Sequence, residues 1–107
     1  INIYSYFYYT EHVKEVHLKV YGRVQGVFFR QSCVARANEL GVFGWVKNCS
    51  DGTVEALCQG DQDQIDRMLD WMSLGPQNAD VEDVRVLFEK DCTKRLEGFN
   101  IIYEESV

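Results

Sequence analysis

One short segment of the sequence has the composition of an anion-binding loop. Residues 22–30 read GRVQGVFFR, with glycines at both ends of the part that must turn. A glycine-permitted turn can point successive N–H groups to one side, and a helix N-terminus directly after it strengthens the resulting anion site. Arg30, where a helix is expected to begin, adds a guanidinium that can donate two parallel hydrogen bonds to phosphate oxygens. The same pattern is also common in ordinary turns, and it matches neither glycine motif that binds nucleotides.

A second segment ends in an asparagine, whose side-chain amide can both donate and accept hydrogen bonds. Asn48 closes the run GWVKN, just before an Asp51-Gly52 pair. Hydrolysis of an already activated phosphoryl bond needs a group that holds and aims water more than it needs a strong base. Asparagine also opens hairpin turns through its own backbone bonds. The two roles are compatible, so Asn48 is a candidate for positioning water as well as a turn residue.

Periodicities in the first half of the chain indicate the elements that position these residues. Apolar side chains alternate from Val16 to Val20, which predicts a strand that runs into Gly22. Helical spacing predicts a helix over about residues 31–40, ended by Gly41. Two more strands, about residues 43–48 and 53–59, are expected to form an antiparallel pair across the Asp-Gly turn.

The second half of the chain completes a known architecture. A second helix is expected after Asp61, with Gln64 three positions on, and Gly75-Pro76 ends it. A fourth strand follows around residues 84–88 and a fifth over residues 99–103. The order is β-α-β-β-α-β-β. It predicts an α+β, ferredoxin-like βαββαβ sandwich, with a mainly antiparallel five-stranded sheet and two helices on one face.

Composition restricts the partners. The chain has 107 residues, 46% of them hydrophobic, which fits one folded domain. A net charge of −6 makes its surface repel polyanions, so no nucleic acid is expected as a partner. No apolar run approaches the length of a membrane-spanning helix, and residues 1–9 are too short and too rich in tyrosine for a signal peptide. No membrane partner and a cytoplasmic location are therefore expected.

The reactive side chains outside the two segments are expected to be structural. The four cysteines are scattered without a C-x-x-C pair or a neighbouring histidine, so no metal site is predicted. Mostly reduced thiols are expected, with a disulfide between spatial neighbours as the alternative. Cys33 lies in a first helical turn, but no base that would activate it is visible. His17 alternates with core-facing residues, and Met68, Trp71 and Met72 fit a helix core.

Taken together, the two segments resemble the signature segments of the acylphosphatase family. The similarity rests on GRVQGVFFR at residues 22–30 and GWVKNCSDGTVE at residues 44–55, and the order of elements is similar as well. It covers about residues 15–103. We therefore expect an acylphosphatase-like domain over residues 15–107, after an N-terminal extension of residues 1–14 that has no assigned role.

The resemblance implies a hydrolase that cleaves the carboxyl–phosphate bond of small acyl phosphates, giving carboxylate and inorganic phosphate. It implies that no metal or cofactor is needed, that Arg30 and the loop amides bind the phosphoryl group, and that Asn48 positions the attacking water. A monomer is expected, with inorganic phosphate or sulfate as a product-like ligand. The loop residues expected to act through their backbone N–H groups are Arg23, Val24, Gln25, Gly26, Val27 and Phe28.

Two other functions compete with this interpretation. The first is a non-catalytic phosphate-sensing or protein-interaction domain on the same fold, in which the loop binds phosphate and no water is aimed. The second is RNA binding on the sheet, which needs stacked aromatic side chains and a basic surface. Aromatic residues are present, but the charge has the wrong sign and no RNP-type octapeptide occurs.

Overall fold

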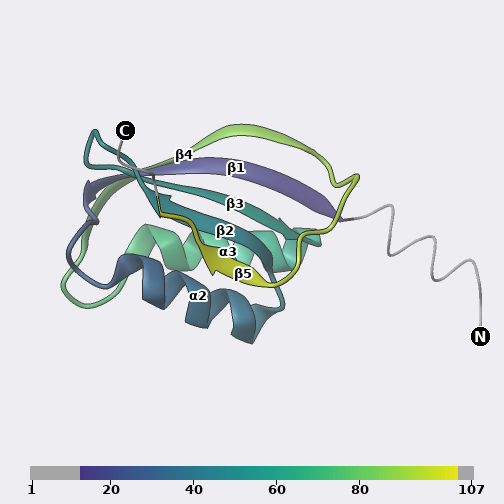
Figure 1. The fold of residues 1–107 in the computed structure, drawn as a ribbon, viewed down its shortest axis with the longest axis horizontal. Helices are drawn as coiled ribbons and strands as arrows, with labels where there is room; N and C mark the ends of the chain where they lie inside the picture. Colours follow the sequence, from purple (N-terminus) through teal and green to yellow (C-terminus); the bar gives the residue numbers. More distant parts are fainter. Residues whose placement is uncertain (1–12, 104–107) are drawn as a thin grey trace, which may run out of the picture.

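A computed structural model describes residues 13–103, which form a five-stranded sheet with two helices packed against one of its faces (Figure 1). The predicted order of elements and the ferredoxin-like α+β fold are confirmed. What was expected of residues 1–12 and 104–107 lies outside the described residues. No helix of the described part is long and apolar enough to cross a membrane. In chain order the elements are β1 (Lys14–Arg23), α2 (Phe29–Leu40), β2 (Phe43–Asn48), β3 (Val54–Gly60), α3 (Gln62–Leu74), β4 (Asp80–Asp91) and β5 (Phe99–Ile101).

The largest differences from the predicted boundaries are in α2, β4 and β5. Helix α2 begins at Phe29, two residues early, because Phe28 takes a left-handed conformation and serves as its N-cap. Strand β4 is longer than its apolar core because it pairs with the whole length of β1 at the sheet edge, where charged side chains face water. Strand β5 ends at Ile101. Helix α3 begins at the predicted capping box, in which Asp61 accepts from the Gln64 N–H and the Gln64 side chain accepts from the Asp61 N–H.

The order of strands brings the C-terminal ends of β1 and β2 to the same end of the sheet. The order is β4-β1-β3-β2-β5, and every neighbouring pair except the parallel β2–β5 is antiparallel. Because β1 and β2 both pair antiparallel with β3, they run in the same direction and end at one edge. Val54 lies opposite Val20 on one side and opposite Asn48 on the other. Neighbouring strands lie about 4.8 Å apart, so Val20, near the end of β1, and Asn48 are separated by about 10 Å.

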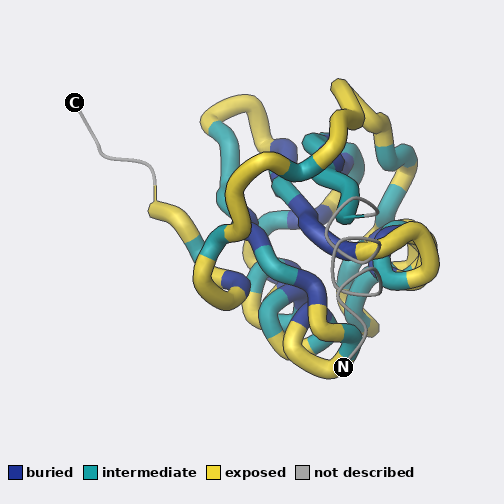
Figure 2. The backbone as a smooth tube through the Cα atoms, turned by 90° about the vertical axis from the view of Figure 1, so that its right-hand side faces the viewer, coloured by how far each residue is buried: buried dark blue, intermediate teal, exposed yellow. Residues whose placement is uncertain are grey.

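The core lies between the sheet and the helices. Figure 2 shows buried stretches towards the interior and exposed stretches on the outer loops. Both predicted helix faces are in the core, including the two methionines of α3, and Trp71 packs against it. All four cysteines are unpaired thiols. The main contributors from β1, α2 and α3 are Val16, Leu18, Val20, Phe29, Cys33, Ala37, Ile65, Met68 and Met72.

One fully buried polar side chain holds the connection between β4 and β5. The Gln59 amide donates to a Glu15 carboxylate oxygen at 2.7 Å and to the Lys94 carbonyl at 2.9 Å, and its oxygen accepts from the Leu96 N–H at 2.9 Å. A buried amide is tolerated only when its donors and acceptor are satisfied in this way. Gln59 therefore ties an otherwise irregular loop to the centre of the sheet.

We predict that Gln59→Leu lowers the free energy of unfolding by about 2 kcal/mol, because the Lys94 carbonyl and the Leu96 N–H lose their side-chain partner. Urea denaturation measures the change. Gln77→Leu, at an exposed position between α3 and β4, is the matched control and should unfold as the wild type does. Equal midpoints for the Gln59 variant and the wild type would show that the amide does not hold this loop.

Candidate functional site

The loop that joins β1 to α2 presents unpaired backbone donors. No backbone N–H of residues 24–28 donates to a backbone carbonyl within residues 13–103, and the first helical bond of α2 is from Ser32 to the Phe28 carbonyl at 3.1 Å. The N–H groups of the first turn of α2 are therefore free as well. Gly26 and Phe28 have positive φ values of 74° and 64°, which turn the loop. These donors, at a helix N-terminus with no acidic side chain in its first turn, favour an anion.

Gly22 permits the close approach of two strands just before this loop. Its φ is 120°, and a Cβ at this position would lie 2.2 Å from the Asp80 carbonyl oxygen on β4. The pairing of β1 with β4 is irregular between Tyr21 and Gly22. A side chain here would force the strands apart and displace the start of the loop, so glycine is required for the geometry of the site.

The side chain of Gln25 ties the loop to the turn between β2 and β3. Its amide donates one hydrogen bond to the Cys49 carbonyl and another to the Thr53 carbonyl, both at 2.8 Å. The prediction gave Gln25 a backbone role and missed this contact. The contact spans 24 and 28 residues, so no local pattern could have revealed it.

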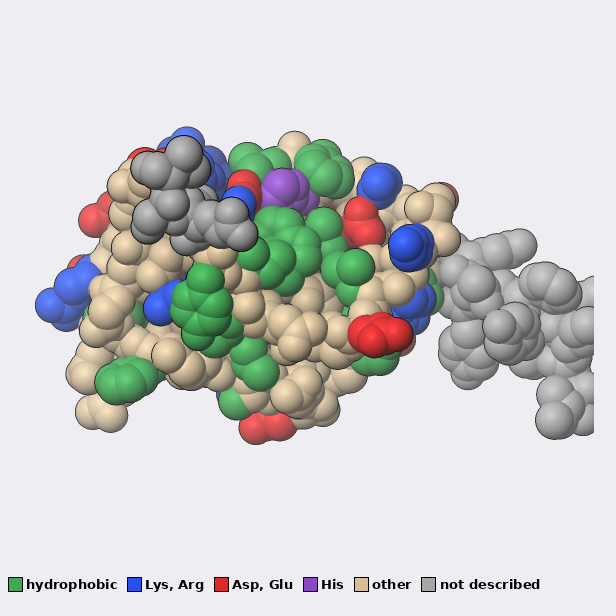
Figure 3. Space-filling view, in the orientation of Figure 1, with side chains coloured by type: hydrophobic (Ala, Val, Ile, Leu, Met, Phe, Trp, Pro, Cys, Tyr) green, Lys and Arg blue, Asp and Glu red, His purple; other side chains and the backbone are tan. Residues whose placement is uncertain are grey.

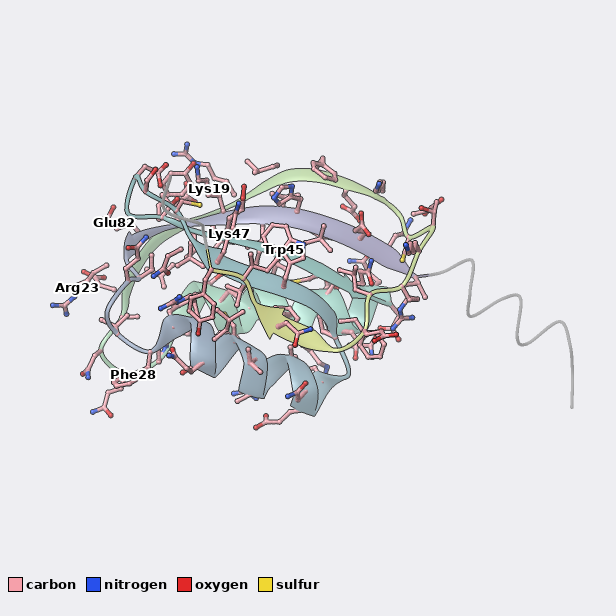
Figure 4. All side chains as sticks on the ribbon, in the orientation of Figure 1. Lys19, Arg23, Phe28, Trp45, Lys47 and Glu82 are labelled. Atoms are coloured by element: carbon pink, nitrogen blue, oxygen red, sulfur yellow. The ribbon has the colours of Figure 1, made fainter. Side chains whose placement is uncertain are left out.

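A cavity of about 170 Å³ lies where the loop meets the end of β2. It brings Arg30 and Asn48 together, as expected, although they are 18 positions apart in the chain. Of the predicted loop residues, Arg23, Gln25 and Val27 do not line it. Arg23 points away from the molecule (Figure 4), and Val27 is buried in the core. The Gln25 side chain instead bonds the turn between β2 and β3. The residues lining the cavity are Val24, Gly26, Phe28, Phe29, Arg30, Gln31 and Asn48.

The side-chain oxygen of Asn48 is buried and has no hydrogen-bond partner among the described residues. An unsatisfied buried acceptor costs about 1–3 kcal/mol, so native structures keep few of them without a reason. Asn48 also lines the cavity, so its side chain lies beside any water molecule bound there. The arrangement suits a residue that holds water beside a bound anion.

Arg30 is half-buried at the start of α2, and its guanidinium lies 5.4 Å from the centre of the Tyr103 ring. Within the described part of the chain it forms no salt bridge with a carboxylate. The aromatic contact restrains the guanidinium and leaves its N–H groups for a ligand. Tyr103 was not among the predicted site residues, since its position in the last strand gave no functional signal.

The turn that follows Asn48 is pinned by Asp51. One carboxylate oxygen accepts from the Thr53 hydroxyl and, at 3.1 Å, from the Thr53 N–H, while the other accepts from Lys19 on β1 at 3.1 Å. These bonds, those from Thr53 first, lower the pKa of Asp51 from 3.8 to about 2. Because Gln25 contacts the same turn, two separate side chains hold the turn, Lys19 from β1 and Gln25 from the loop that follows β1.

The other reactive side chains lie outside the cavity. Burial raises the pKa of the Cys33 thiol, which lies in the core, so a nucleophilic role is disfavoured. His17 packs edge-on against Trp45 and Phe88, on the sheet face opposite the helices, with Nε2 3.3 Å from a Glu55 carboxylate oxygen. Figure 3 shows hydrophobic side chains gathered around this histidine. Residues 13–103 contain no cluster of His, Cys, Asp and Glu side chains that could hold a metal ion.

The three comparisons with known proteins give the same result. The family model for acylphosphatases matches residues 16–101. The acylphosphatase of Bordetella parapertussis is 52% identical over 73 residues, which are 68% of this chain and 78% of that protein. The acylphosphatase of Thermococcus kodakarensis is 46% identical over 86 residues, 80% of this chain and 92% of that protein. The crystal structure of acylphosphatase from Bacillus subtilis matches with a TM-score of 0.80 at 32% identity, covering 84% of this chain and 99% of that one.

We predict that the stabilising effect of Asp51 is lost in acid. Since its pKa falls from 3.8 to about 2 on folding, the contribution is full above about pH 4 and disappears as the pH falls towards 2. Urea unfolding at several pH values should therefore show Asp51→Ala less stable than the wild type at pH 5, with the difference shrinking towards pH 2. A difference that stays constant over this range would contradict the assignment.

Proposed function

This chain belongs to the acylphosphatase family and hydrolyses acyl phosphates, and we propose that the reaction takes place in the cavity between residues 24–28 and Asn48. One observation carries the proposal. Asn48, whose side-chain oxygen is buried and unpartnered, lines the same cavity as Arg30 and a loop with free backbone N–H groups. A binding site for the phosphoryl group and a binding site for water thus lie next to each other.

The phosphoryl group binds to the loop amides and to Arg30. Its transfer passes through a loose transition state in which negative charge is spread over the equatorial oxygens. Fixed N–H donors, the N-terminal end of α2 and a guanidinium all stabilise that charge without having to reorganise. Gln25 contributes by keeping the loop against the turn, so its donors are in place before the substrate arrives.

Asn48 aims the water. The water donates one hydrogen bond to the Asn48 oxygen, and its own oxygen attacks phosphorus as the bond from phosphorus to the acyl oxygen breaks. That electron pair leaves with the carboxylate, which is a good leaving group, so no general acid is required. An amide cannot take up the water proton, which passes to a phosphoryl oxygen. This explains how the site works without a paired acid and base.

The same proposal covers the wider setting of the enzyme. We infer that the protein acts as a monomer. The unpaired thiols support a reducing, cytoplasmic location. The net charge of −6 supports a small acyl phosphate as the partner, with inorganic phosphate or sulfate as product-like ligands, and neither nucleic acid nor a membrane. We place the catalytic domain at residues 15–107, with residues 1–14 as an extension.

We predict that Arg30→Ala lowers kcat/KM for benzoyl phosphate by about 10³-fold, as loss of a transition-state arginine does, and that Asn48→Ala lowers kcat by about 10²-fold. Hydrolysis is followed by the loss of benzoyl phosphate in the presence of a chelator. Arg67→Ala and Asn38→Ala, both at exposed helix positions, are the matched controls and should keep wild-type rates.

Wild-type rates in folded Arg30→Ala and Asn48→Ala variants would contradict the assignment of the site. A phosphate titration separates the non-catalytic alternative. If the wild-type protein binds phosphate and yet hydrolyses benzoyl phosphate no faster than buffer does, the chain is a phosphate-binding domain and not an enzyme.

We predict that Gln25→Leu raises KM and weakens inhibition by phosphate about tenfold, with a smaller effect on kcat. Two hydrogen bonds at about 1 kcal/mol each hold the loop, and a tenfold change corresponds to about 1.4 kcal/mol. Steady-state kinetics with phosphate as inhibitor measure both constants, and urea unfolding checks that the variant is folded. Unchanged inhibition by phosphate would show that the loop keeps its shape without the side chain.

A further inference from the structure

The cavity is too small to enclose a large acyl phosphate together with the attacking water. Its volume of about 170 Å³ is below the range of about 300–1,000 Å³ that is typical of pockets which enclose a drug-sized ligand. Arg30, Asn48 and the loop amides make it suitable for a phosphoryl group and a water. A substrate bound in this way places its acyl group outside the enclosed part, against whatever side chains form the rim. A large acyl group is therefore recognised by residues at the rim.

One rim residue has a backbone conformation that its side chain disfavours. Within residues 13–103, Phe28 is the only residue other than glycine with a positive φ, at 64° with ψ at 24°. Glycine adopts this left-handed conformation freely, whereas a Cβ is crowded in it. As the N-cap of α2, Phe28 also lacks a side-chain oxygen to bond the helix N-terminus. Neither the turn nor the helix accounts for a phenylalanine here.

Packing within the domain does not account for it either. The side chain of Phe28 is 70% exposed, whereas its neighbour Phe29 is 1% exposed and lies 5.6 Å from the Trp71 ring. In Figure 4 Phe28 stands at the outer side of the loop, beside the start of α2. Covering an exposed ring with a ligand is favourable, in proportion to the apolar area that is removed from water. Tyr103, which does not line the cavity, already lies on the Arg30 guanidinium.

We propose that the Phe28 ring is the binding surface for the acyl group, so that the enzyme favours acyl phosphates whose acyl group is aromatic or large and apolar. The inference rests on the proposed function, because Phe28 lines the cavity that also contains Arg30 and Asn48. Binding the phosphoryl group in the cavity brings the acyl group to this ring. An aromatic acyl group can stack on it, whereas an acetyl group covers little of it.

The test compares kcat/KM for benzoyl phosphate and for acetyl phosphate in each variant. The ratio of the two constants is the readout. Damage to the binding site for the phosphoryl group lowers both constants, so its effect cancels in the ratio. We expect the ratio to fall about tenfold in Phe28→Ala, to fall less in Phe28→Leu and to be kept in Phe28→Tyr. Phe28→Gly relieves the positive φ, and it should show the same tenfold fall together with a higher melting temperature.

Phe88→Ala is the matched control, since it removes an exposed ring from β4 at a position that does not line the cavity, and it should keep the wild-type ratio. An unchanged ratio in Phe28→Ala and Phe28→Gly would overturn the inference, even if both substrates are hydrolysed. Failure of the proposed function has a different signature, because folded Arg30→Ala and Asn48→Ala variants would then hydrolyse both substrates at wild-type rates, and the inference would fall with it.

Discussion

Strand β3 lies between β1 and β2 and runs antiparallel to both, with Val54 opposite Val20 on one side and opposite Asn48 on the other. This register decides what can meet at the edge of the sheet. A shift of β2 by one residue would turn the Asn48 side chain to the opposite face of the sheet, away from the loop that joins β1 to α2. The buried valines of β1, β2 and β3 and the helices packed on them hold the register. The site is thus a consequence of how the core is packed.

Much of the fold could be predicted because its determinants are local in the chain. The alternation from Val16 to Val20, the Asp51-Gly52 turn and the capping box of Asp61 and Gln64 each lie within a few residues, and each is present in the structure. The two motif segments also predicted that Arg30 and Asn48 would come together. Their individual roles stay predictions that kinetics must test.

The features that escaped prediction depend on contacts between distant segments or on backbone geometry. Gln25 bonds carbonyls 24 and 28 residues away, and Gln59 bonds a loop more than thirty residues on, so neither partner is visible in a local pattern. The left-handed conformation of Phe28 could not be predicted from the sequence, because phenylalanine rarely adopts a positive φ. Gln25 supports the site, and we infer that Phe28 determines its specificity for the acyl group.

The acidity of the chain and its affinity for an anion are reconciled by distance. A net charge of −6 acts on a polyanion through many contacts, but charges farther apart than about 8 Å are largely screened at physiological salt. A phosphoryl group in the cavity is governed by its immediate neighbours, which are backbone N–H groups, a helix N-terminus without acidic residues and Arg30. The acid-rich surface is compatible with a small anionic substrate for this reason.

The central claim is that the cavity holds the phosphoryl group and aims a water at phosphorus. Hydrolysis of benzoyl phosphate in water labelled with oxygen-18, under single-turnover conditions, tests it directly, because mass spectrometry of both products shows which atom the water attacked. We expect the label to appear in inorganic phosphate and none in the benzoate. Label in the benzoate would show that water attacks the carbonyl carbon and not phosphorus.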